Sequence, residues 1–162
     1  MKMTEWFQVQ LQASGEGFVW GAEQVPSGRR AMQPPAKLGE WTAARHVFHM
    51  LDYEQKEALP SMQQWLGGPL PADSDEDVAW NGDNQDMDSL LARFKQVRAE
   101  QIALLPKFEE ADWPTTREAV WGPRSLLWVV SKTYQHTCEH SHDVLRLALF
   151  WDFYARPQES EA

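Results

Sequence analysis

Two histidines four residues apart, His136 and His140, are the residues of this sequence whose type and spacing best suit chemistry. They lie within 125–154, a stretch without Gly or Pro that is predicted to form one long helix. Positions i and i+4 of a helix lie one turn apart, so both imidazoles point the same way. A neutral imidazole offers a lone pair, and this spacing lets two rings share one metal ion. The pair therefore predicts a metal site whose third ligand comes from elsewhere in the chain.

The face of the helix that carries both histidines is otherwise apolar or uncharged, as expected of a face that packs on a core. Its other members are Leu126, Val129, Val130, Thr133, Thr137, Val144, Leu147, Ala148 and Trp151. Two imidazoles on such a face could simply hydrogen-bond to neighbours, but a shared metal ion is the partner that this spacing favours. His142 projects far from the face and is predicted to lie at the surface or rim.

The elements that must position these residues are three further helices. The first is predicted from Thr4 to about Val25, with Thr4 as its N-cap and a bend or break near 14–17, where two glycines weaken it. The second is predicted from Thr42 to Leu59, with Thr42 as N-cap and Pro60 as the stop. Its apolar stripe does not select a buried ligand, because His46 and His49 both lie on the flank of that stripe.

The third helix is predicted from about 86–89 to Pro106. Composition indicates a linker over 26–40 and a long ordered loop over 61–85, and a loop of that length is often a functional lid. Its tryptophans, Trp65 and Trp80, are candidates for pocket walls. The other tryptophans singled out, at helical positions, are predicted to lie in the core: Trp20, Trp128 and Trp151.

Four amphipathic helices and no strand pattern predict an all-α fold, an up-and-down four-helix bundle with a long loop between helices two and three. A length of 162 residues fits one domain over 1–162. Metal sites in such bundles use inward side chains from facing helices. Cys138, the one cysteine, lies on a different face from His136 and is expected to be a packed thiol rather than a nucleophile.

Composition limits the class of partner. The net charge of −9 argues against nucleic acid, since an acidic surface repels phosphates. No apolar run is long enough to span a bilayer and the start lacks a signal peptide, so we expect a cytoplasmic protein without a membrane partner. Nucleotide-binding motifs are absent, so no nucleotide cofactor is expected. The nine tryptophans permit a homodimer built on an exposed aromatic face.

Two segments together resemble the DinB-like family of metal-binding four-helix bundles. WTAARHVFHMLDYE, residues 41–54, is similar to that family's second helix, in which a Trp-Ser/Thr pair precedes a metal-binding histidine by eight residues. HTCEHSHD, residues 136–143, is similar to its fourth-helix signature, His-x-x-x-His followed by a polar residue. The order and lengths of the helices agree as well, so the resemblance covers nearly the whole chain.

The resemblance implies that His49, His136 and His140 bind one divalent metal ion, with zinc or nickel as the best candidates. His46, one turn before His49, is the alternative ligand and would otherwise lie behind the ligands or at the rim. Many relatives have Arg-Gly-Gln after the second helix-four histidine, where this chain has Ser-His-Asp, so Asp143 could orient a ligand instead. No catalytic residue is assigned, although the acidic and phenolic groups that follow His49 are candidates: Asp52, Tyr53 and Glu54.

Family members include transferases and isomerases that use low-molecular-weight thiols. The first hypothesis is an enzyme in which the metal activates a thiol or water against a small electrophile, in a pocket at one end of the bundle beneath the 61–85 loop. Three neutral ligands leave the ion charged and with an open position, which suits that chemistry. The rival hypothesis is a stress-associated or binding protein whose metal only holds helices two and four together.

Overall fold

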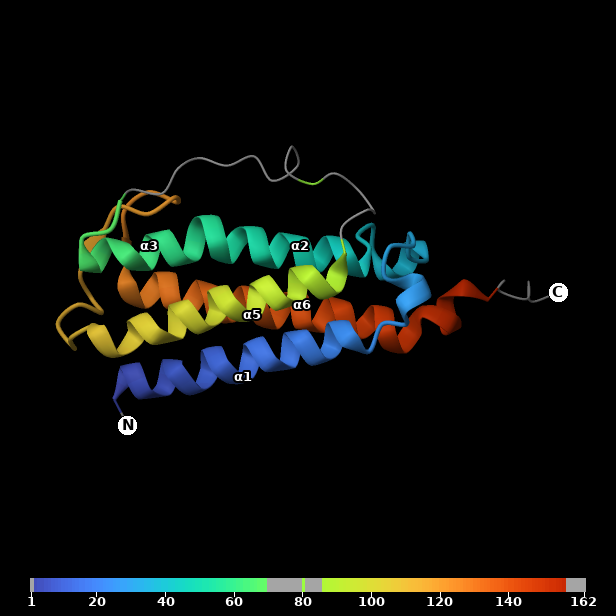
Figure 1. Cartoon of the computed structure of the whole chain (residues 1–162), viewed down its shortest axis with the longest axis horizontal. Coiled ribbons are helices and arrows are strands. Elements are labelled where there is room, and N and C mark those ends of the chain that lie inside the picture. Colours follow the sequence, from blue (N-terminus) through green and yellow to red (C-terminus); the bar gives the residue numbers. More distant parts are fainter. Residues whose placement is uncertain (1, 70–79, 81–85, 157–162) are drawn as a thin grey trace.

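The computed structural model describes residues 2–69, 80 and 86–156, and these form a four-helix bundle (Figure 1). The chain builds α1 (Met3–Glu23), α2 (Ala43–Tyr53), α3 (Leu59–Gln63), α5 (Met87–Leu104) and α6 (Leu126–Ala155). Short 3₁₀ turns cover Ser27–Arg29, Ala36–Leu38, Gln64–Leu66 and Leu105–Lys107. The all-α bundle predicted from the sequence is confirmed, and the long helix, predicted over 125–154, is α6.

The helices α1 and α6 run in one direction and α2 with α5 in the other (Figure 1). Close packing of α1 on α6 depends on Gly21, where an added Cβ would lie 3.2–3.3 Å from side-chain atoms of Leu145 and Val144. On the opposite pair, Arg93 of α5 donates to Gln55 beside α2 at 2.9 Å. Because α2 and α5 are neighbours that run the same way, the end of α3 and the start of α5 lie at opposite ends of the bundle (Figure 1).

Side-chain caps fix where three helices begin. The hydroxyl of Thr42 accepts a hydrogen bond from Arg45 N–H at 3.1 Å, which confirms the predicted cap of α2. Asp86 caps α5 by accepting from Ser89 N–H, and Ser125 caps α6 by accepting from Trp128 N–H. The predicted cap of α1 is wrong, because Thr4 lies inside that helix and Lys2 holds the cap position.

Proline 60 does not end the second helix as predicted. A π-helical turn, Glu54–Ala58, joins α2 to α3, and the helical path continues through Pro60 to Gln63. Proline lacks an N–H and its ring clashes with the carbonyl four residues earlier. A wider i→i+5 turn before the proline, closed by Leu59 N–H donating to the Glu54 carbonyl, accommodates both effects.

The predicted break at 14–17 is absent, since α1 is continuous across both glycines. Gly15 is instead a packing position. A Cβ there would lie 3.2 Å from Cγ of Arg98, so the missing side chain makes room for the arginine stem.

Arg98 of α5 forms a buried ion pair with Glu54, and both side chains are at most 5% exposed. Its Nε donates to one Glu54 oxygen at 3.1 Å and its Nη2 donates to the other. The same guanidinium also donates to the Leu11 carbonyl of α1 at 2.8 Å and to the Thr137 hydroxyl of α6 at 2.7 Å. One arginine thus links all four helices.

The apolar core forms two clusters along the bundle. One, centred on residues such as Phe18, Phe94 and Leu147, fills the half near the start of α2, and the other, around Leu11, Trp113 and Leu126, fills the other half. The predictions for helix tryptophans hold only in part. Trp151 is 6% exposed, but Trp20 is 57% and Trp128 37% exposed, because the turns that carry them face solvent at the bundle surface.

The structure departs from the sequence predictions at two further places. The strands β1 (Thr116–Arg117) and β2 (Arg124–Ser125) form a two-stranded antiparallel hairpin, which the sequence pattern did not predict. The side chain of Cys138 is exposed rather than packed.

Most of the predicted 61–85 loop lies outside the described residues, whereas 61–66 is helical. Among the described residues, no helix combines the length and apolar character needed to cross a bilayer.

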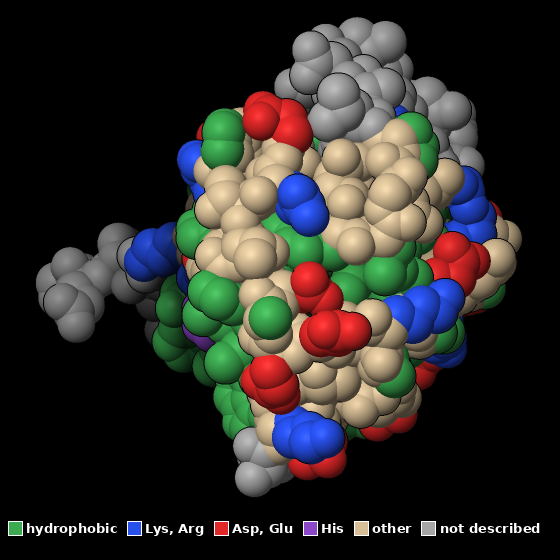
Figure 2. Space-filling view, turned by 90° about the vertical axis from the view of Figure 1, so that its left-hand side faces the viewer, with side chains coloured by type: hydrophobic (Ala, Val, Ile, Leu, Met, Phe, Trp, Pro, Cys, Tyr) green, Lys and Arg blue, Asp and Glu red, His purple; other side chains and the backbone are tan. Residues whose placement is uncertain are grey.

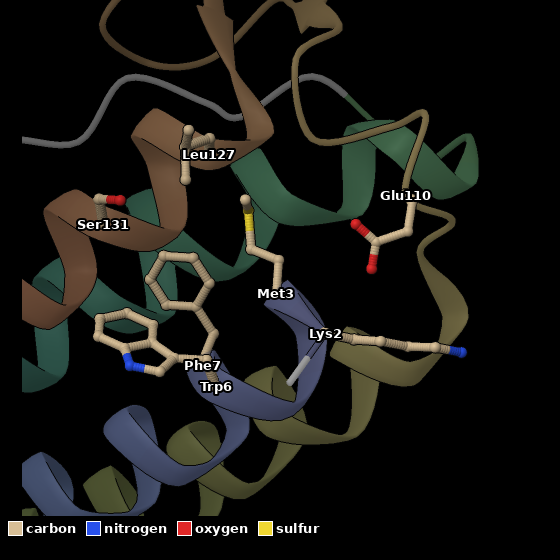
Figure 3. Close-up of a pocket in the computed structure, with 7 residues that line it drawn as sticks. All are labelled: Lys2, Met3, Trp6, Phe7, Glu110, Leu127 and Ser131. Carbon is tan, nitrogen blue, oxygen red and sulfur yellow. The ribbon is translucent and has the colours of Figure 1, made fainter.

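The end of the bundle that bears the N-terminus of α1 is a mixed surface (Figure 2). Hydrophobic, acidic and basic side chains are interspersed on this face. A groove of about 800 Å³ opens at this end, between the first turn of α1 and the start of α6 (Figure 3). Its lining includes Met3, Trp6 and Phe7 but no histidine.

Replacing Glu54 by Gln should destabilise the fold by about 3–5 kcal/mol, because the buried Arg98 would lose its counter-charge. Urea unfolding measures the change. Glu23→Gln, which breaks an exposed pair with Lys95, is the control and should cost no more than about 1 kcal/mol. Equal effects of the two substitutions would contradict a structural role for the buried pair.

Candidate metal centre

Three imidazoles from two helices converge midway along the bundle. His49 lies on α2, and His136 and His140 lie one turn apart on α6. The Nε2 of His136 is 3.0 Å from Nε2 of His49 and 3.2 Å from Nε2 of His140. The structure therefore brings together all three residues that the resemblance named as ligands, and they form a group that could hold a metal ion.

The spacing of these nitrogens fits a small divalent ion. Imidazole nitrogens bind zinc at about 2.0–2.1 Å, so two ligands of one ion lie roughly 3.3 Å apart in tetrahedral geometry and about 2.9 Å apart at right angles. The two observed separations fall between these values.

Hydrogen bonds alone would satisfy this cluster poorly. A ring nitrogen either donates one proton or accepts at one lone pair. The Nε2 of His136 nevertheless faces two other Nε2 atoms at hydrogen-bonding distance. A metal ion accepts a lone pair from each of the three rings, so the donor set suits a cation better than it suits an isolated hydrogen-bond network.

His46, the alternative ligand, lies behind the cluster rather than in it. Its Nδ1 is 2.9 Å from Nδ1 of His140, on the side of that ring away from His136. His46 also belongs to a second group of potential donors, with His140 and Asp143. His142 is exposed, as predicted, and belongs to neither group, although its Nδ1 lies 3.5 Å from a carboxylate oxygen of Asp143.

Burial keeps the imidazoles of His46, His136 and His140 neutral. It lowers the pKa of His136 to about 3 and that of His140 to about 2, and neighbouring histidines lower both further. Burial also lowers the pKa of His46 to about 4, although the Asp143 carboxylate opposes the shift. Neutral rings are the form that binds metal, so desolvation prepares these residues to act as ligands near pH 7.

Aromatic side chains wall the cluster. The ring of Trp41 lies parallel to that of His140, with centroids 6.0 Å apart, and its centroid is 5.0 Å from that of His49. The Tyr53 ring meets His136 edge-on at 4.3 Å, and Trp121 lies 5.8 Å from Tyr53. The sequence analysis assigned no role in the site to Trp41 or Trp121. For Trp41, the signal in the sequence was its position directly before Thr42, the N-cap of α2.

The loop tryptophans proposed as pocket walls lie elsewhere. Trp65 donates its Nε1–H to the Thr115 hydroxyl at 2.7 Å and so fastens the segment after α3 to the hairpin region. Trp80 packs on Phe48, with centroids 5.2 Å apart, and on Arg45. Neither tryptophan has a ring contact with the three clustered histidines.

Of the three candidates for acid, base or orienting groups, only Tyr53 reaches the cluster. Glu54 forms a buried ion pair with Arg98, and Asp52 forms an ion pair with Lys56, one helical turn later. The Tyr53 hydroxyl lies 3.5 Å from the Thr133 hydroxyl, and burial raises the pKa of Tyr53 well above its usual range. Tyr53 therefore remains a neutral hydrogen-bond donor beside His136.

The cluster lies in the middle of the bundle rather than in a pocket at one end. An open groove of about 750 Å³ runs along α6, and His140 is the one member of the cluster that lines it. The other lining residues come from the same helix: Tyr134, Gln135, Cys138, Glu139, His142 and Asp143. Residues 70–79 and 81–85 of the loop that was expected to cover the site lie outside the described residues.

Comparison with known proteins agrees with this arrangement. The sequence model of the DinB superfamily matches residues 23–144, which include all three clustered histidines. The chain belongs to the DinB superfamily. A sequence comparison with curated proteins found no match.

The fold is similar to that of a solved structure, a histidine-to-alanine mutant of the mycothiol-dependent maleylpyruvate isomerase. The TM-score is 0.67 with 14% sequence identity, over 88% of this chain. The match covers 61% of the isomerase, so this DinB-superfamily chain spans about three-fifths of the length of that enzyme. At this identity the likeness shows a shared fold.

The metal-free protein should lose stability as the pH falls from 7.5 to 5.5. Unfolded histidines take up protons below about pH 6.5, whereas the buried rings do so only near pH 2–4. The unfolded state then binds more protons, and each such histidine contributes up to about 1.4 kcal/mol of lost stability per pH unit. Urea unfolding of chelator-treated protein measures the slope.

The variant His140→Gln should flatten that slope by up to about 1.4 kcal/mol per pH unit. His142→Gln, an exposed position on the same helix, is the matched control and should leave the slope unchanged. An unchanged slope in His140→Gln would contradict the burial of a neutral ring at position 140.

Proposed function

We propose that this protein is a metal-dependent enzyme that activates a thiol or water for transfer to, or hydrolysis of, a small electrophile. His49, His136 and His140 are the proposed ligands of one divalent ion, with zinc or nickel as the best candidates. The observation that carries the proposal is the convergence of the Nε2 atoms of the half-buried His49 and the buried His136 and His140, with His136 Nε2 at 3.0 and 3.2 Å from the other two.

The number of ligands supports a catalytic rather than a closed site. Structural zinc sites are usually filled by four protein ligands, whereas catalytic sites use three and leave a position open. A divalent ion in this cluster would supply a Lewis acid that lowers the pKa of a thiol or water. His46 and Asp143 could add donors only on the far side of His140.

The remaining residues would bind and orient the reactants. The neutral Tyr53 hydroxyl beside His136 can donate a hydrogen bond to an electron-rich oxygen of the electrophile. The Trp41 ring, which is half-buried over His49 and His140, offers an apolar wall that excludes water. Access along the α6 groove would bring a reactant to His140.

The comparison with the isomerase favours a thiol among the reactants. That protein is described as mycothiol-dependent, and its fold is shared by this chain. We propose a low-molecular-weight thiol as the activated group and a small electrophile as its partner, with water as the alternative nucleophile.

Purified protein should bind one zinc or nickel ion per chain. The variants His49→Ala, His136→Ala and His140→Ala should each weaken binding at least about 100-fold, since each removes one of three ligands. Titration against a competing chelator measures the affinity. His142→Ala is the control and should bind as tightly as the unmodified protein. Retained affinity in the three ligand variants would contradict the proposed ligand set.

The metal-loaded protein should accelerate the reaction of a thiol such as mycothiol or glutathione with a small electrophile. Activity should disappear on chelation and return when the metal is restored. A chromatographic assay across a panel of thiols and electrophiles, including hydrolysis without thiol, measures turnover. A metal-loaded protein that is inert toward the whole panel would contradict the enzymatic proposal.

The aromatic wall favours one alternative. Trp41 and Tyr53 pack on the clustered histidines, Trp121 packs on Tyr53, and the groove along α6 reaches only His140. This enclosure suits a non-catalytic, binding or stress-associated bundle in which the metal fastens α2 to α6. In that case the ligand variants would lower the melting temperature sharply, and the panel above would give no turnover.

A further inference from the structure

His46 on α2 has no part in the proposed ligand set, but it faces one of the proposed ligands, His140 on α6. Both side chains are buried, and their Nδ1 atoms are 2.9 Å apart. Two protonated nitrogens would repel at that distance, and two lone pairs would do the same. One Nδ1 must therefore carry a proton and the other a lone pair.

The geometry of His140 decides which nitrogen carries the proton. Its Nε2 faces the Nε2 of His136, inside the cluster, while its Nδ1 faces His46. A neutral imidazole has one lone pair. If that lone pair points into the cluster, the proton is on Nδ1, and it points at His46.

We infer that His46 is a positioning residue, whose Nδ1 accepts a hydrogen bond from the Nδ1–H of His140 and so fixes the orientation of His140 for binding metal through Nε2. The inference rests on the proposed metal site. It assigns His46 a single tautomer, with its own proton on Nε2.

The contrast with His136 shows what His46 adds. The Nδ1 of His136 is buried and has no hydrogen-bond partner among the described residues. That ring is held by packing instead, with Tyr53 edge-on at 4.3 Å. An acceptor behind a ligating histidine orients the ring and makes it a better ligand. Of the two α6 ligands, His140 is therefore the one held by a hydrogen bond.

The same geometry argues against a second metal ion between His46, His140 and Asp143. These residues form a possible donor group. However, His140 could serve both groups only by losing the protons from both ring nitrogens. With one neutral His140, a metal at Nε2 leaves a proton at Nδ1, and His46 is then an acceptor rather than a second ligand.

The test compares two substitutions of His46. His46→Asn places an amide oxygen near the position of Nδ1 and retains an acceptor, whereas His46→Leu fills similar space without one. His46→Leu should weaken zinc binding about 10- to 100-fold, and His46→Asn should recover most of that loss. Affinity is measured against a competing chelator, with melting temperatures of the metal-free forms as a check on folding. His142→Leu is the matched control on α6.

A spectroscopic measurement tests the tautomers directly. Long-range ¹H–¹⁵N spectra of the zinc-loaded protein should show His140 protonated at Nδ1 and His46 protonated at Nε2. His140 protonated at Nε2, equal affinities of the Leu and Asn variants, or two zinc ions per chain would each overturn the inference. If His46→Leu binds zinc normally while His136→Ala does not, the positioning role fails and the metal site stands. If the unmodified protein binds no zinc or nickel, both fail.

Discussion

The constraint on which this structure depends is the burial of imidazole nitrogens that face one another between α2 and α6. His49, His136 and His140 present three Nε2 atoms to one point, and burial depresses the pKa of the two on α6. Mutual protonation is unfavourable there, and hydrogen bonds can satisfy only part of the set. A cation held by the three rings would remove this conflict, because it accepts a lone pair from each Nε2.

The bundle holds this arrangement through a second buried polar group. Arg98 pairs with Glu54 on the π-helical turn after α2 and donates to Thr137, which lies between the two α6 histidines. Because the same guanidinium also reaches α1, the axial positions of α2 and α6 are tied to each other and to the rest of the fold. The register that aligns His49 with its partners is therefore fixed by charge pairing as well as by apolar packing.

Aromatic side chains cover much of the histidine cluster, and a groove leads to one of its members. Trp41 packs on His49 and His140, and Tyr53 packs on His136. The groove along α6 approaches His140. The chain belongs to the DinB superfamily and shares its fold with a mycothiol-dependent isomerase. The groove at the N-terminal end of α1 is lined by no histidine, so cavity volume alone would have pointed to one end of the bundle rather than to the histidine cluster in its middle.

The sequence by itself determined the helices, the Thr42 cap and the common face of His136 and His140, because helical periodicity and capping act over a few residues. Resemblance to a family, rather than periodicity, selected His49. Only the tertiary structure placed His46 behind His140, brought Trp41 over the site and carried the helix through Pro60. Those outcomes depend on which helix faces lie opposite each other, and that is set by packing between residues some 90 positions apart in the chain, which no local pattern records.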